Sequence, residues 1–186
     1  MNSSNERPDA EAQHVIDALR LAGEQADSVV ELFRRGLQVL VRASDASFGS
    51  VFVRDPDDTG LLRLACASNW PQAAARYLGS LRLRVGRGPT GRAVAEGRPV
   101  EVANVFADPA LNDWWQPARE LGYHGLLSLP LRTHGSTPGA VTLYFTEARH
   151  LARDRRLVLE AGVDALARAW TELSDRSPPP SPSGQG

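Results

Sequence analysis

Two residue types that carry much of protein chemistry are nearly absent from this chain. A single cysteine, Cys66, among 186 residues excludes an intrachain disulfide and a thiolate-rich metal site. Lysine is missing altogether, so the 21 basic residues are all arginine, and they are scattered along the sequence. This bias is better explained by a genome rich in G and C than by bidentate anion binding.

The chain also lacks an excess of either charge and any long apolar run. A formal net charge of −1 offers no basic surplus for nucleic acid or an anionic membrane. No segment approaches the ~20 apolar residues of a membrane span, and the polar, acidic start at residues 1–12 is unlike a secretory signal. We therefore expect a cytoplasmic protein with neither nucleic acid nor a membrane as partner.

Motifs that would indicate catalysis are missing as well. The four histidines, His14, His124, His134 and His150, have none of the spacings typical of a metal site. The glycine-rich stretch 86–91 lacks the Gly-Lys-Ser/Thr ending of a phosphate-binding loop, so it is interpreted as a strand-to-helix turn. No Ser/His/Asp arrangement can be argued from spacing. We expect no catalytic residue, no metal and no cofactor.

The pattern of apolar residues predicts an α+β domain with a central antiparallel sheet. Apolar residues recur every three or four positions over 10–44, where Gly23 is expected to break the helix and Asp27 or Ser28 to start a second one. Further helices are expected over 73–78, 92–96, 114–121 and 152–173, and strands over 48–54, 61–67, 81–85, 99–103, 125–132 and 139–146. Residues 1–9 and the Pro/Ser-rich tail 174–186 are expected to be disordered, which leaves one domain over 10–173.

Alternation along the last two expected strands gives the sheet two different faces. One face is purely apolar, and the other mixes apolar side chains with hydroxyl groups. The apolar face holds Leu127, Leu129, Leu131, Val141, Leu143 and Phe145, and the mixed face holds Leu126, Ser128, Pro130, Ala140, Thr142 and Tyr144. We expect the terminal helices to cover the apolar face and a ligand pocket to lie on the mixed one.

Five stretches, in this order and spacing, resemble the GAF family over residues 27–173. They are the glycine loop at 86–94, Gly-Arg-Pro-Val at 97–100, the Asp-Pro bend at 104–109, and the strands 125–132 and 139–144. The resemblance implies a stand-alone bacterial sensory module that binds a small molecule under its middle insertion and signals through a partner protein. It also implies a homodimer through the terminal helices, and the spacing of Leu159, Val163, Leu166, Trp170 and Leu173 would suit such a seam.

The expected pocket lies under residues 104–123, which are predicted to form a lid with little regular structure. Two adjacent tryptophans in such a segment need at least one buried ring, which either covers the open face of the sheet as part of the core or forms an aromatic wall for the ligand. The candidate ligand-binding residues are Asn112, Trp114, Trp115, Tyr123, His124, Ser128, Thr142 and Tyr144.

Three alternatives stay open at this point. Some GAF sensors hold haem through a histidine near position 124, although the sequence around His124 does not match that pattern. A GAF-fold methionine sulfoxide reductase is known, but that chemistry uses several cysteines and this chain has only Cys66. A ligand-free dimerisation scaffold would result if Trp114 and Trp115 filled the pocket themselves.

Overall fold

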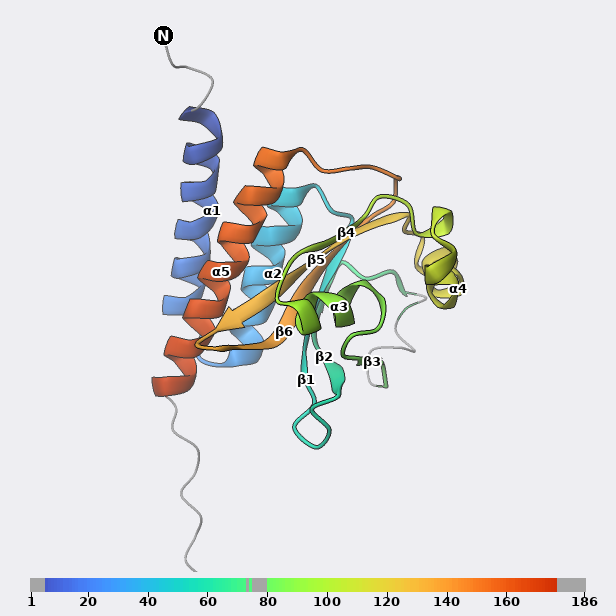
Figure 1. Cartoon of the computed structure of the whole chain (residues 1–186). Helices are drawn as coiled ribbons and strands as arrows, with labels where there is room; N and C mark the ends of the chain where they lie inside the picture. The colour runs from blue at the N-terminus through green and yellow to red at the C-terminus, as the bar shows by residue number, and fades with distance from the viewer. Residues whose placement is uncertain (1–5, 73, 75–79, 177–186) are drawn as a thin grey trace, which may run out of the picture.

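Three helices form a layer against one face of a six-stranded sheet (Figure 1). The computed structural model describes residues 6–72, 74 and 80–176. The helices of the layer are α1 (Glu6–Glu24), α2 (Val29–Ser44) and α5 (Arg153–Arg176). Helices α1 and α5 lie side by side and run in the same direction, with α2 beside them (Figure 1).

The sheet has the strand order β3-β2-β1-β6-β5-β4, and neighbouring strands pair antiparallel. Its strands are β1 (Phe48–Arg54), β2 (Leu61–Ser68), β3 (Arg82–Arg84), β4 (Val100–Val102), β5 (Gly125–Thr133) and β6 (Ser136–Phe145). This arrangement confirms the α+β class with a central antiparallel sheet that the sequence predicts.

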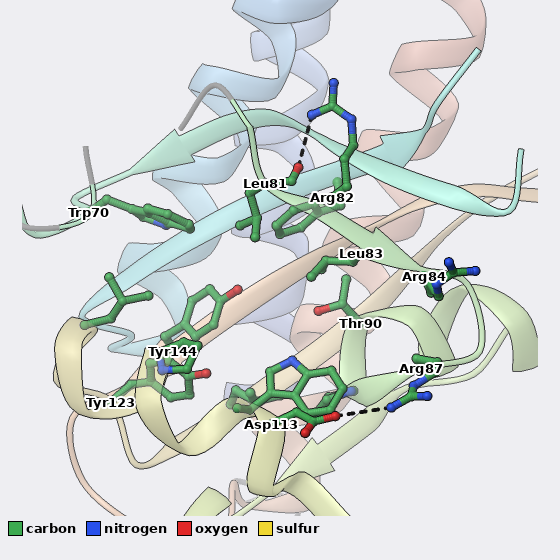
Figure 2. Close-up of a pocket in the computed structure, with 16 residues that line it drawn as sticks. Trp70, Leu81, Arg82, Leu83, Arg84, Arg87, Thr90, Asp113, Tyr123 and Tyr144 are labelled. Carbon is green, nitrogen blue, oxygen red and sulfur yellow. Dashed lines mark hydrogen bonds and ion pairs between the residues drawn. The ribbon is translucent and has the colours of Figure 1, made fainter. Parts of the chain in front are cut away.

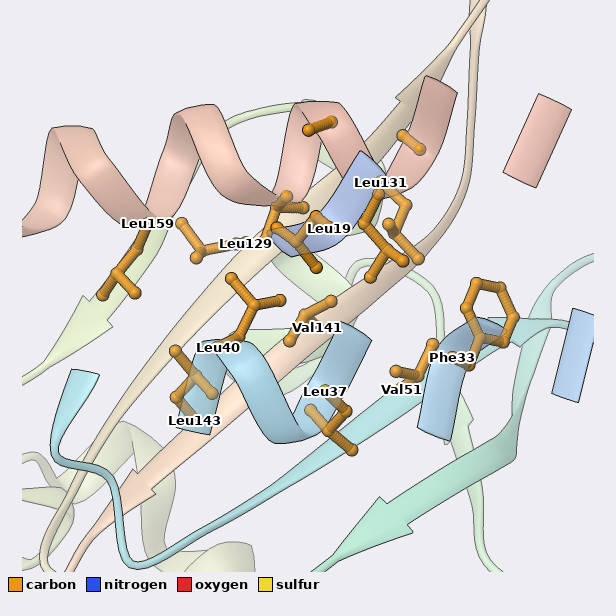
Figure 3. Packing of buried hydrophobic residues seen from close by; sticks show 14 of the residues in the cluster. Leu19, Phe33, Leu37, Leu40, Val51, Leu129, Leu131, Val141, Leu143 and Leu159 are labelled. Carbon is orange, nitrogen blue, oxygen red and sulfur yellow. The ribbon is translucent and has the colours of Figure 1, made fainter. Parts of the chain in front are cut away.

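The apolar face of β5 and β6 packs against the helical layer, as the alternation of residues predicts. Leu127, Leu131 and Leu143 are fully buried there, together with side chains of α1, α2 and α5 (Figure 3). The helices approach one another closely at small residues. A methyl group added at Gly36 of α2, for example, would lie 2.6 Å from Leu166 Cδ1 of α5. The main core therefore lies between the three helices and this face of the sheet.

The residues that we expected to form a dimer seam pack against other parts of the same chain. Leu159, Val163, Leu166 and Leu173 are buried in the core just described, and Trp170 packs edge-on against Phe33 with ring centroids 5.0 Å apart. Their spacing is thus explained by packing of α5 on its own sheet and neighbouring helices.

Several predicted boundaries need correction. Helix α1 begins at Glu6 rather than residue 10, and it ends at Glu24, one residue after Gly23, so the chain does break into two helices where expected. A Cβ added at Gly23 would lie 2.8 Å from Ala169 Cβ of α5. Helix α2 begins as predicted, after Ser28, whose hydroxyl caps it by accepting a hydrogen bond from Glu31 N. Helix α5 continues to Arg176, three residues into the stretch expected to be disordered.

The other face of the sheet is covered by shorter elements. They are α3 (Gly88–Glu96), which starts four residues before the expected helix, two 3₁₀ turns (Val105–Ala107 and Pro109–Leu111) and α4 (Asn112–Leu121). The helix expected over 114–121 is α4, which begins at Asn112, whereas the expectation of little regular structure in the lid as a whole was wrong. The side chains of Asn104 and Asp108 each cap one 3₁₀ turn by accepting a backbone N–H. The helix predicted at 73–78 lies outside the described residues.

Candidate ligand-binding site

A cavity of about 430 Å³ lies on the sheet face opposite the three helices. Strands β1, β5 and β6 form its floor, and β3, the start of α3 and α4 enclose it (Figure 2). It is lined by Phe52, Trp70, Leu81, Arg82, Leu83, Arg84, Arg87, Pro89, Thr90, Asp113, Trp114, Pro117, Leu121, Tyr123, Leu126 and Tyr144. This volume is within the usual range for small-molecule sites.

One end of the cavity is a cluster of aromatic rings. The ring of Tyr144 stacks on Phe48 at 4.7 Å between centroids, and Tyr123 meets Tyr144 at 5.0 Å. Trp70 meets the same tyrosine edge-on at 6.4 Å. Each ring contacts several others, so this wall is held in place by packing on both sides of the opening.

Three polar atoms belong to this aromatic end, and only one has a partner among the residues that the structure describes. The Tyr144 hydroxyl lies 3.2 Å from Ser50 Oγ, in hydrogen-bonding distance. Tyr123 is only 3% exposed, yet its hydroxyl makes no hydrogen bond within the described part of the chain. The indole N–H of Trp70 is buried and likewise has no partner among the described residues. An unpaired buried donor such as this indole N–H is uncommon in folded proteins.

Burial also fixes the protonation state of the two tyrosines. It raises the pKa of Tyr144 to about 12, although the hydrogen bond from Ser50 partly opposes the shift. Burial, and secondarily the neighbouring Tyr144, raises the pKa of Tyr123 as well. Both phenols are therefore neutral at physiological pH and can donate a hydrogen bond.

The charged side chains that line the cavity in the described part of the chain lie around its rim. Arg87 Nη2 lies 3.2 Å from Asp113 Oδ2, and this exposed ion pair joins the loop before α3 to the first turn of α4 (Figure 2). Arg82 Nε lies 3.0 Å from Asp55 Oδ2, on the outer side of β3. Arg84 is exposed at the end of the cavity away from the tyrosines (Figure 2).

A second contact also joins α4 to the start of α3. The indole of Trp114 lies directly on Gly88, which has a positive φ of 61°, and a Cβ at that glycine would overlap the ring. Glycine is therefore needed at this position for its backbone conformation and for its lack of a side chain. Together with the Arg87–Asp113 pair, this contact clasps α4 over the cavity.

The structure brings three of the eight predicted site residues to the cavity, namely Trp114, Tyr123 and Tyr144. Asn112 and Trp115 do not line it, and Trp115 donates its indole N–H to Val105 O at 2.8 Å instead. His124 is exposed, and its Nδ1 donates to Thr146 O at 2.8 Å, which turns the ring away from the cavity.

Ser128 and Thr142 lie on the predicted face of the sheet but underneath α3. Thr90 Oγ1 lies 2.9 Å from Thr142 Oγ1 and 3.4 Å from Ser128 Oγ, and the two strand hydroxyls are 3.0 Å apart. All three residues are buried. This hydroxyl cluster anchors the first turn of α3 to the sheet, and of the three only Thr90 also lines the cavity.

Trp70, Leu81 and Leu83 are cavity residues that were not predicted from the sequence. They come from the connection between β2 and β3 and from β3 itself. Alternation in 81–85 was a usable signal, because it separates Leu81 and Leu83 from the exposed Arg82 and Arg84. Trp70 had no such signal beyond being a large aromatic residue outside a regular element.

Neither of the groups considered for cofactor or redox chemistry faces the cavity. A bulge in β2 pairs Cys66 with Val51 and turns the thiol toward the helical layer, where burial raises its pKa. Among the described residues, no three His, Cys, Asp or Glu side chains gather as a metal site requires. None of the described helices is both long and apolar enough to cross a bilayer.

The sheet order and the helical layer define an α+β domain with a cavity on the sheet face opposite its helices. Residues 26–170 match the family model of the GAF domain, and the chain belongs to this family, whose members are sensory and regulatory modules of signalling proteins. No curated protein matches the sequence.

Solved structures agree on the fold. The GAF domain of a phosphoenolpyruvate-protein phosphotransferase from Coxiella burnetii is 21% identical with a TM-score of 0.74, covering 90% of this chain and 96% of that one. A free methionine-R-sulfoxide reductase from Neisseria meningitidis is 21% identical, with a TM-score of 0.72 and coverages of 89% and 90%. The nlh2 GAF domain of A. aeolicus, in an inactive state, is 17% identical, with a TM-score of 0.68 and coverages of 89% and 98%.

Proposed function

We propose that this chain is a sensory GAF module that binds a small molecule in the cavity and acts through a partner protein without catalysing a reaction. The observation that carries the proposal is the partly open cavity of about 430 Å³ between the sheet and α4. A cavity of this size that is lined by aromatic rings and a few polar groups favours a small-molecule ligand.

The placement of Cys66 supports binding over catalysis. One neighbour in fold is a methionine sulfoxide reductase, and thiol chemistry would require a reactive cysteine at the cavity. In this chain the thiol is on the opposite face of the sheet, with a raised pKa that lowers its thiolate fraction. The ionisable side chains of the rim are held in ion pairs or face solvent, so the described residues offer the cavity no obvious acid or base.

The proposal also includes a cellular location and an oligomeric state. We place the module in the cytoplasm of a bacterium, where it would relay ligand binding to a downstream signalling protein. A homodimer would use the outer surfaces of α1 and α5, because the inner ones are occupied by the core. Leu21 and Leu157, which are 49% and 51% exposed, offer apolar contacts on these two helices. Light scattering at micromolar concentration tests this assembly, and a monomer would exclude it.

Native mass spectrometry of freshly purified protein, followed by denaturing analysis of released molecules, tests ligand binding. We expect a mass increment that is lost on denaturation and reduced in Trp114→Ala. The matched control is Trp170→Phe, which changes a tryptophan on the helical side of the sheet. A bound mass that both variants retain equally, or a crystal structure in which side chains fill the cavity, would contradict the proposal.

A further inference from the structure

Among the described residues, the aromatic end of the cavity holds no ionised side chain, and Arg84, which also lines the cavity, is exposed at the opposite end (Figure 2). Two of the arginines at the rim are already paired with carboxylates, Arg82 with Asp55 and Arg87 with Asp113. Both members of the second pair have side chains more than 60% exposed, so this charge lies in solvent at the mouth. An ionised group carried into the interior would lose its hydration without gaining a counter-charge, which is costly.

Two neutral groups in the aromatic end, in contrast, lack a partner among the described residues. The Tyr123 side chain is 3% exposed, and its hydroxyl points into the space beside Tyr144 (Figure 2). The Trp70 N–H is enclosed by protein, so a molecule in the cavity cannot reach it. The Tyr123 hydroxyl is therefore the group left for a ligand, and it can donate or accept a hydrogen bond.

We infer that the cavity binds an uncharged ring compound that carries a hydrogen-bonding group, with its ring among the aromatic side chains and that group at the Tyr123 hydroxyl. This inference rests on the proposed function and specifies the ligand class for the same site. Planar rings fit a wall built from stacked and edge-on aromatic side chains. The polar group supplies the hydrogen bond that the Tyr123 hydroxyl does not find within the described part of the protein.

Three probes of equal ring size separate the contributions. Naphthalene has the ring alone, 2-naphthol adds an uncharged hydroxyl, and 2-naphthoate adds a carboxylate. In equilibrium dialysis at pH 7, we expect 2-naphthol to bind about fivefold to tenfold more tightly than naphthalene, the effect of about one net hydrogen bond. We expect 2-naphthoate to bind more weakly than naphthalene, and the affinity for 2-naphthol to be unchanged between low and high salt.

Variants assign the hydroxyl preference to a residue. Tyr123→Phe keeps the ring, so it should leave naphthalene binding unchanged and abolish the advantage of 2-naphthol. Trp70→Phe should leave this advantage in place, because the indole N–H is not accessible from the cavity. Tyr144→Phe is the matched control, because its hydroxyl is already engaged by Ser50 and should contribute little to the preference. Circular dichroism of each variant establishes that the fold is intact before binding is compared.

The outcomes distinguish the ligand class from the site itself. Tighter binding of 2-naphthoate than of 2-naphthol, or an equal advantage of 2-naphthol in Tyr123→Phe, would overturn the inference while the proposed binding function stands. Failure of all three probes to bind the wild type would overturn the inference. If native mass spectrometry also detects no bound molecule, the proposed function fails with it.

Discussion

Replacing Gly88 with alanine tests the clasp between α4 and the start of α3. The substitution has two costs. Alanine in the left-handed region costs about 1–2 kcal/mol, and its Cβ must displace the Trp114 indole that lies on Gly88. Truncating a fully buried tryptophan costs about 3–5 kcal/mol, so displacing this half-buried ring should cost about 2 kcal/mol. We expect Gly88→Ala to lower the free energy of unfolding by about 3–4 kcal/mol in total.

A matched glycine separates the two costs. Gly135 has a φ of 74°, and no atom of the described residues outside its own turn lies within 4 Å of the place that a Cβ would take. Gly135→Ala should therefore cost only the conformational part, about 1–2 kcal/mol. In a Trp114→Ala background, Gly88→Ala should fall to the same value. Urea unfolding followed by far-UV circular dichroism measures all four variants without relying on tryptophan emission. Equal costs for Gly88→Ala and Gly135→Ala in the wild-type background would refute the clasp.

Three further outcomes follow from the same structure. Arg87→Gln should change the free energy of unfolding by at most about 1 kcal/mol, because its pair with Asp113 is exposed, and a larger loss that persists in high salt would contradict this. Leu166→Glu should unfold the protein at room temperature, since it buries an unpaired charge in the core, and a folded monomer by circular dichroism and light scattering would refute that placement. Because folding raises the pKa of Tyr144 from 10.0 to about 12, and that of Tyr123 in the same direction, only the unfolded chain ionises above pH 10. The urea midpoint should hold up to about pH 10 and fall toward pH 12; a midpoint that stays level there would count against buried phenols.

The alternation of residues in β5 and β6 was sufficient to predict which sheet face carries the helices. It could not predict what covers the opposite face. Ser128 and Thr142 were correctly assigned to that face, but α3 seals them beneath Thr90, and nothing in their own strands indicates where α3 lies. The assignment of the pocket to this face was therefore right in outline and too broad in its residues.

The two adjacent tryptophans illustrate a second limit. Successive residues of a helix point about 100° apart, so only one of Trp114 and Trp115 can face a cavity on one side of α4. Both tryptophans lie within the helix expected over 114–121, yet both were given the same role. In the structure Trp114 faces the cavity while Trp115 bonds to Val105 O and holds α4 to the preceding turn. Trp70, Leu81 and Leu83 reach the site only through the tertiary fold.

Successive residues of strand β6 face opposite sides of the sheet. Tyr144 forms part of the cavity wall, and Phe145, the next residue, faces the helical side. The guanidinium of Arg149 lies 4.3 Å from the Phe145 ring centroid and donates a hydrogen bond to Ser44 O, at the last residue of α2. A ligand that pushes on Tyr144 thus acts on the same short stretch of backbone that holds the end of α2. Under the proposed function, ligand binding in the cavity is coupled directly to the helical side of the sheet, because both surfaces belong to strand β6.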